Sequence, residues 1–538
     1  MAQDNPVRNQ AQPTSASSSP PPPPTNQVPT KTWIGLMGAM LGAFMAVLDI
    51  QITNSSLAEI QAALGATLEE GSWISTAYLV AEVVVIPLTG WLSQVFSIRR
   101  YLLVNTALFI FFSICCAWSV NLQMMIVFRA LQGFTGGVLI PMAFTIVLTT
   151  LPPAKQPVGM ALFSITATFA PSIGPTLGGW LTDNLGWQYN FYLNVLPGIL
   201  MITMIAYAIP AKPMQLNLLK QGDWWGIISM AVGLGSLEVV LEEGNRKDWF
   251  GSEEITRLAV VASVFLFAFL WIELTRRRPF INLHILLRRN FGIGSIAGLT
   301  LGLGLYGSVY ILPLYLSRIK DYTAMQIGEV IMWSGLPQLF LIPFVPKLMQ
   351  RFDARFLAAV GYSLFAVSCF MNSHMTHDTG IEELRWSQLV RAVGQPLMIV
   401  PLTSIATGNI EREQAGSASG LFNMMRNLGG SIGIAILSTL LTRRQQFHSN
   451  RIGESVSLFN PETQQRIEQL TQAFVSKGID PTTAHNQAIA TIDNIVRRES
   501  FVMAFNDGFY FVGIALLVSG ITLLFCKKVK PGAGGAAH

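Results

Sequence analysis

The sequence predicts an all-α membrane protein with two six-helix halves and two helices inserted between them. The first observation is composition: the 538 residues are 51% hydrophobic and only 12% charged, with a mean hydropathy of +0.45. Ordinary soluble domains carry about 25% charged residues, so this composition argues against a soluble enzyme. The second observation is that apolar residues fall in windows long enough to cross a bilayer. The third is a set of short motifs that recurs at a fixed offset.

Fourteen apolar windows approach the roughly 20 residues that a helix needs to span a bilayer core. Their predicted bounds are 33–57, 73–92, 101–120, 124–148, 158–182, 189–209, 224–241, 258–274, 291–316, 326–346, 356–373, 387–408, 416–441 and 506–526. The first 32 residues, rich in Pro and Ser, are predicted to form a disordered cytoplasmic tail (1–32), and 527–538 a second cytoplasmic tail.

Basic residues predict the orientation of these spans. With the N-terminus in the cytoplasm, the inner segments carry nineteen Lys and Arg residues and the short outer loops carry six. The positive-inside rule therefore places both termini in the cytoplasm, and an even number of spans agrees.

One outer segment, 443–505, is much longer than the others. Asn460-Pro461 and Asp480-Pro481 each have the pattern of a helix N-cap followed by Pro at the first helical position. We expect two amphipathic helices outside the membrane. They form either a solvated hairpin or a docking site for a periplasmic partner, and the sequence leaves both open.

An internal repeat predicts the division into halves. Leu162-Phe163 matches Leu421-Phe422, and the Ser-Ile-Gly run at 172–174 matches the one at 431–433, all at an offset of 259. We expect an N-terminal half at 33–209, inserted helices 7 and 8 within 210–280, and a C-terminal half at 281–526. Parallel repeats of this kind are a transporter architecture, with substrate bound near the midplane.

Charged residues inside the spans are the main functional candidates, since each costs about 2.5–3.5 kcal/mol at a helix centre. Asp49 heads a polar stripe with Thr53 and Ser56, which we expect to face a water-filled cavity and to let Asp49 bind and release a proton. Arg129 is its expected partner, and Glu82 is a second candidate for proton coupling. The alternative for each is a purely structural polar contact.

Glu238 is a weaker candidate, because the seventh span belongs to the predicted inserted pair. The substrate cavity is expected to be mainly apolar and aromatic, with a few polar groups. Its predicted lining comprises Gln51, Thr53, Asn54, Tyr78, Gln132, Tyr306, Tyr310, Trp333, Asn423 and Arg426.

Motifs of other function classes are missing from the sequence. It contains no Walker A motif and no HExxH. Its four cysteines lie inside apolar runs without metal-ligand spacing. A membrane-embedded enzyme is therefore a remote alternative, and we expect no catalytic residue, no metal and no cofactor.

Several motifs resemble the major facilitator superfamily. Gly90-Trp91-Leu92 followed by Arg99-Arg100 resembles its signature loop, although Gln94 and Ser97 stand where that family usually has Asp and Gly. The run from Arg129 to Gly133 resembles its helix 4 motif. Glycines and a proline in the fifth span resemble its antiporter motif. The residues assigned to conformational motifs are Gly90, Arg99, Arg100, Gly174, Pro175, Gly178 and Gly179.

Further matches indicate a subgroup. Leu48-Asp49 with Asn54 resembles the helix 1 motif of fourteen-span drug:proton antiporters, and the run 87–92 resembles the EmrB-type exporters of Gram-negative inner membranes. The resemblance implies proton-driven efflux of hydrophobic toxic compounds, powered by the proton gradient. It also implies a tripartite pump with a periplasmic adaptor of the EmrA type and a TolC-like outer-membrane channel. A stand-alone or metabolite-specific exporter, for a fatty acid or siderophore, is the alternative.

Overall fold

The computed structural model describes residues 28–528 except 221, 277–278, 409 and 458, and the regular secondary structure of this part of the chain consists of helices. The predicted tails therefore lie outside the described residues, apart from 28–32 and 527–528. Residues 30–32 already belong to the first helix.

Within the described residues, fourteen helical segments are long and apolar enough to cross a membrane, which confirms the predicted number. The first six are α1 (Thr30–Ser55), α4 (Trp73–Phe96), α5 (Ile98–Ala117), α6 with α7 (Leu122–Gly136, Leu139–Thr150), α8 (Gln156–Leu185) and α9 with α10 (Tyr189–Tyr192, Val195–Ala208). The next two are α12 (Trp224–Glu243) and α13 (Glu253–Thr275). The last six are α14 (Arg289–Ile319), α15 with η3 and α16 (Ala324–Leu341, Ile342–Phe344, Val345–Arg351), α17 (Ala354–Asn372), α18 (Ile381–Thr407), α19 (Ala415–Ser455) and α21 (Pro481–Leu523).

Short helices connect the spans. They are α2 (Leu57–Ala63), α3 (Leu68–Gly71), α11 (Asn217–Lys220), η1 (Trp249–Gly251), η2 (Leu283–Leu287), η4 (Arg412–Gln414) and α20 (Pro461–Val475).

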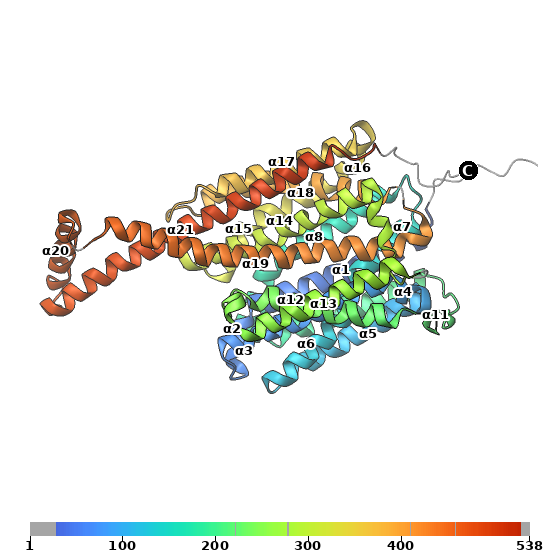
Figure 1. The fold of residues 1–538 in the computed structure, drawn as a ribbon, viewed down its shortest axis with the longest axis horizontal. Helices are drawn as coiled ribbons and strands as arrows, with labels where there is room; N and C mark the ends of the chain where they lie inside the picture. The colour runs from blue at the N-terminus through green and yellow to red at the C-terminus, as the bar shows by residue number, and fades with distance from the viewer. Residues whose placement is uncertain (1–27, 221, 277–278, 409, 458, 529–538) are drawn as a thin grey trace, which may run out of the picture.

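The predicted caps of the outer segment are present, but its second helix is not a separate element. Asn460 Oδ1 accepts the Glu462 N–H at 2.9 Å, and Asp480 Oδ2 accepts the Thr482 N–H at 3.1 Å. From Asp480 onward, however, α21 runs unbroken for 43 residues into the last span. After its first position this helix contains no Pro, so nothing in the backbone stops it at the membrane surface. The protruding hairpin thus comprises the end of α19, α20 and the start of α21 (Figure 1).

Helix packing gives two groups of spans with α12 between them. In the first group α1 packs on α7, α8 and α10, and α4 packs on α6; in the second α14 packs on α19 and α21, and α17 on α18. The groups meet where α8 contacts α15 and α4 contacts α19. Helix α12 packs on α13 and also touches both α4 and α19. The inserted helix therefore contacts both groups (Figure 1).

The two groups close on each other at one end of the bundle. We call this the terminal end, because α1 starts and α21 finishes there, and the opposite end, which carries α20, the hairpin end (Figure 1). A Cβ built on Gly90 of α4 would lie 2.6 Å from the carbonyl oxygen of Gly416, and Ser419 Oγ donates to Pro141 O at 2.7 Å. Only a residue without a side chain permits this approach of α4 to α19.

Candidate functional site: a buried ion pair beside a central cavity

Asp49 and Arg129 form an ion pair inside the first group of helices. Arg129 Nη1 lies 2.7 Å from Asp49 Oδ2, and both residues are 1% exposed. The pairing predicted from the sequence is therefore present. A charge in such a place is retained only when it is paired and hydrogen-bonded.

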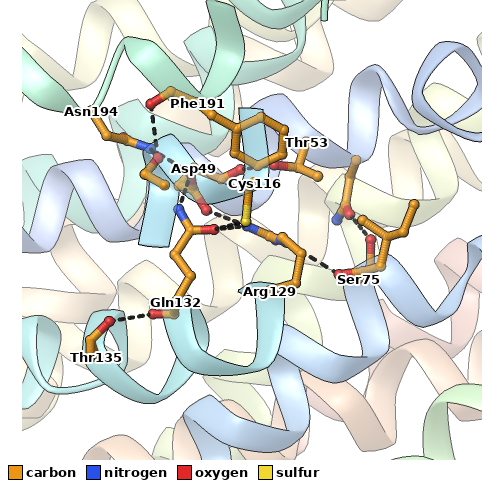
Figure 2. Close-up of polar contacts among 12 residues, drawn as sticks. Asp49, Thr53, Ser75, Cys116, Arg129, Gln132, Thr135, Phe191 and Asn194 are labelled. Atoms are coloured by element: carbon orange, nitrogen blue, oxygen red, sulfur yellow. Dashed lines mark hydrogen bonds and ion pairs between the residues drawn. The ribbon is translucent and has the colours of Figure 1, made fainter. Parts of the chain in front are cut away.

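Two amides complete the surroundings of the carboxylate (Figure 2). Gln132 Nε2 donates to Asp49 Oδ1 at 3.0 Å, and Asn194 Nδ2 donates to the same oxygen at 2.6 Å. Asn194 also donates to Ser113 Oγ at 3.0 Å. Asp49 thus accepts from three side chains that all donate, which suits an ionised carboxylate.

The guanidinium of Arg129 is equally well held. Its Nε donates to the Ile74 carbonyl at 3.2 Å, its Nη1 donates to Gln132 Oε1 at 2.8 Å, and it stacks 4.3 Å from the ring centroid of Tyr78. Gly133, one turn further along α6, lies against the Tyr78 backbone, where a Cβ would clash. Helices α1, α4, α6 and α10 are therefore joined at one polar centre.

The predicted polar stripe of α1 does not face the central cavity. Thr53 Oγ1 donates to the Asp49 carbonyl at 2.8 Å, and Ser56 bonds to Gly178 O and to Asn190. The stripe instead faces the interior of the first group. Periodicity identified the polar face correctly, but not which neighbour that face meets.

The central cavity has a volume of about 420 Å³ and lies between the two groups of helices. Gln51, Asn54, Tyr306 and Tyr310 line it as predicted. A narrow neighbouring compartment is lined by Gln51, Tyr306, Arg391 and Arg426. Arg426 therefore lines this compartment and not the central cavity.

The other five predicted lining residues do not line these two spaces. Thr53, Tyr78 and Gln132 belong to the ion-pair network described above. Asn423 is buried and donates to the Ser419 carbonyl, and Trp333 stacks on Arg385 at 5.4 Å. In each case the polar or aromatic group contacts another residue of the helix bundle.

Glu82 lies at the junction of the two groups. It is buried, lines the cavity, and accepts from Asn427 Nδ2 of α19 at 3.3 Å. This places the second candidate for proton coupling in the wall of the cavity, apart from the Asp49 network.

The motif glycines of α8 support close packing on α1. A Cβ on Gly174 would clash with the Gln51 side chain, and one on Gly178 would clash with Ser55. Gly179 is buried nearby, and Pro175 lines the cavity. Gly90 has the analogous role between α4 and α19.

The signature loop departs from its usual chemistry at Ser97. This residue adopts φ +70° and ψ 138°, a sparsely populated conformation that costs a side-chain-bearing residue about 1–3 kcal/mol. Arg99 is half-buried and Arg100 is exposed at the start of α5. The turn is retained although Ser replaces the usual Gly.

Two acidic residues of α12 line the central cavity, although the predicted lining contains no residue of this helix. Glu238 and Glu242 both line the central cavity. In the sequence, Glu238 stands out as a charge inside an apolar run, but its place in the predicted inserted pair makes it a weaker candidate. Contacts of α12 with both α4 and α19 are the reason for the difference.

Comparison with known proteins decides the family. The family model of the Major Facilitator Superfamily matches residues 39–434. The chain belongs to this superfamily. Within it, the chain is 32% identical over 503 residues to the colistin resistance protein EmrB of Acinetobacter baumannii, covering 93% of this chain and 98% of that protein. It is 33% identical over 505 residues to the multidrug export protein EmrB of Escherichia coli K12, with 93% and 96% covered.

A third relative bears on the predicted alternative. The fatty acid resistance protein FarB of Neisseria gonorrhoeae is 31% identical over 499 residues, with 93% of this chain and 96% of that protein covered. Among solved structures, the proton:xylose symporter XylE superposes with a TM-score of 0.60 at 12% identity, covering 93% of this chain and 97% of that one. The chain is therefore an EmrB-type, multi-pass secondary transporter of this superfamily and not an enzyme.

Proposed function

We propose that this transporter exports hydrophobic and amphipathic toxic compounds in exchange for protons. The observation that supports this most directly is the fully buried Asp49–Arg129 pair on the helix that also lines the cavity. A proton reaching Asp49 removes the partner of Arg129, and its release restores the pair. Each charge that crosses 100 mV supplies about 2.3 kcal/mol to such a cycle.

The cavity supports an amphipathic cargo. Its wall is mostly apolar, with Leu79, Val83, Val309 and Ile434 among the lining residues. Its volume of about 420 Å³ falls within the roughly 300–1,000 Å³ that is typical of drug-sized ligand sites. The relatives named as multidrug and colistin resistance proteins agree with this class of substrate.

We further propose a bacterial inner-membrane location with both termini in the cytoplasm, supported by the distribution of Lys and Arg along the sequence. In that orientation the structure is closed toward the cytoplasm, at Gly90 and Gly416, and the cavity lies on the periplasmic side.

The test is accumulation of a fluorescent hydrophobic drug in an efflux-deficient Gram-negative host, with and without a protonophore and a co-expressed adaptor. We expect lower accumulation in expressing cells and its reversal by the protonophore. Unchanged accumulation of every hydrophobic drug would contradict the proposal.

The hairpin is the proposed docking site for an EmrA-type adaptor, which in turn reaches a TolC-like channel. Helix α20 packs on α21 and extends the bundle beyond the spans (Figure 1). Replacing residues 456–480 by a short linker should abolish co-purification with the adaptor while protonophore-sensitive transport in membrane vesicles persists. Full adaptor capture by this variant would show that docking occurs elsewhere.

A second candidate, export of a metabolite with a carboxylate such as a fatty acid, is favoured by one observation. Arg391 and Arg426 line the narrow compartment next to the cavity, and guanidinium groups are suited to carboxylates. Three results together would favour this candidate. The wild type exports a labelled fatty acid, Arg426→Gln abolishes that export, and the wild type does not export uncharged drugs.

A further inference from the structure

The inserted helix α12 places two carboxyl groups in the wall of the central cavity. Glu238 and Glu242 lie four residues apart, hence on one face of the helix, and Glu82 of α4 joins them. Among the residues that line this cavity, all within the described part of the chain, there is no Lys, Arg or His. The cavity wall is therefore acidic on its α12 and α4 side.

Only one of the two carboxylate oxygens of Glu238 has a hydrogen-bond partner among the described residues. Glu238 is 0% exposed, and its Oε1 accepts from Ser431 Oγ of α19 at 2.6 Å. Its Oε2 has no hydrogen-bond partner among the described residues. A carboxylate is an acceptor, and a buried acceptor without a donor is unfavourable. This oxygen thus lacks a donor, and the residue lines a space of about 420 Å³.

Glu82 is less available than Glu238. It accepts from Asn427 and lies within the electrostatic influence of Arg426. Glu242 is half-buried beside the same space. The open acceptor and the acidity therefore coincide at Glu238.

Aromatic groups line the same cavity. Tyr306 and Tyr310 come from α14, together with the apolar Val309 and Leu314. Tyrosine rings attract cations through their faces, more strongly where water is scarce. The basic side chains Arg391 and Arg426 line the separate narrow compartment. Charge is thus distributed unevenly between two neighbouring spaces.

We propose that Glu238, with Glu242 beside it, binds the cationic group of an amphipathic substrate while the apolar and aromatic wall holds the rest of the molecule. The inference rests on the proposed function in taking this cavity as the substrate cavity. It goes further by naming the charge of the preferred substrate and by giving the inserted helix a direct part in selecting it.

Two probes of the same shape and opposite charge test this: tetraphenylphosphonium, a cation, and tetraphenylborate, an anion. Equilibrium binding of each is measured on the full chain in lipid nanodiscs at neutral pH. We expect Glu238→Gln to weaken tetraphenylphosphonium binding at least tenfold and to leave tetraphenylborate binding unchanged or tighter. Glutamine keeps the size and an acceptor oxygen, so the difference reports charge.

Glu273→Gln is the matched control. Glu273 is a second carboxyl of the inserted pair, on α13; it is also 0% exposed, accepts from the Ile281 N–H, and lines neither the central cavity nor the narrow compartment. This variant should bind both probes like the wild type. If Glu238→Gln fails to fold, Glu242→Gln should show the same direction of change, because that side chain is only half-buried.

Three outcomes would overturn the inference: unchanged cation binding by the Glu238 variant, equal weakening of both probes, or a wild type that binds only the anion. Export of an uncharged dye by the wild type distinguishes a failure of this inference from a failure of the proposed function. If the dye is exported in a protonophore-sensitive way but cation binding fails the test, the function stands and the inference falls. If no hydrophobic compound is exported, the proposed function itself falls.

Discussion

Replacing Asp49 by Asn should destabilise the protein strongly, because it removes one member of a buried ion pair. Three side chains donate to this carboxylate, from Arg129, Gln132 and Asn194. An asparagine amide offers one acceptor oxygen, and its NH₂ group would face a donor. Arg129, 1% exposed, would retain its charge without a partner. Breaking such a pair costs about 3–5 kcal/mol.

The double variant Asp49→Asn/Arg129→Gln separates stability from transport. It removes both charges, so we expect it to regain more than half of the stability that Asp49→Asn loses. Under the proposed function it should still fail to couple drug export to proton uptake. Stability is measured by thermal unfolding in detergent, and coupling by proton uptake in proteoliposomes.

If Asp49→Asn alone is as stable as the wild type, the pair does not contribute as a buried charge pair. If the double variant is stable and also couples export to protons, Asp49 is a structural residue and proton coupling must rest elsewhere, with Glu82 as the next candidate.

Three further changes test the packing. Ser97→Gly should stabilise the fold by about 1 kcal/mol, since Ser97 has φ +70°. A lower midpoint temperature of thermal unfolding in this variant would contradict the prediction. Gly90→Ala should block closure at the terminal end, because its Cβ would lie 2.6 Å from a carbonyl oxygen of α19. Gly235→Ala is the control and should not block closure, since its Cβ would lie 3.5 Å from the nearest atom. The accessibility of a cysteine introduced at the terminal end measures the difference. Glu243→Ala should lower the free energy of unfolding by about 1–3 kcal/mol, since Glu243 accepts a hydrogen bond from Thr76 at 3.2 Å. Unchanged thermal stability would contradict this and would show that other contacts hold α12 in place.

The sequence was sufficient for the spans because a bilayer imposes a length and an apolar composition that can be counted along the chain. It also identified the Asp49–Arg129 pair, since opposite charges inside apolar spans each need a partner. Both predictions depend on costs that hold wherever the helices pack.

The cavity lining was predicted less well, for a physical reason. In a chain that is apolar on most helix faces, periodicity does not distinguish a face toward lipid from one toward a cavity or another helix. The sequence predicts Thr53 and Tyr78 in the cavity wall, whereas both belong to the ion-pair network. It makes Glu238 a weaker candidate, whereas this residue lines the cavity. For each of these residues, the helix packed against it determines whether the side chain lines the cavity or joins the ion-pair network.

Helix α1 connects the two polar sites, which bears on how coupling works under the proposed function. One of its faces carries Asp49 in the buried network, while Gln51 and Asn54 line the cavity. The glycines Gly174 and Gly178 let α8 lie directly against this helix, where any side chain would clash. Under the proposed function, a shift of α1 as a rigid element on loss of the ion pair would carry the cavity-lining residues with it. Coupling then needs no relay of titratable side chains between the sites, because the backbone of α1 is the connection.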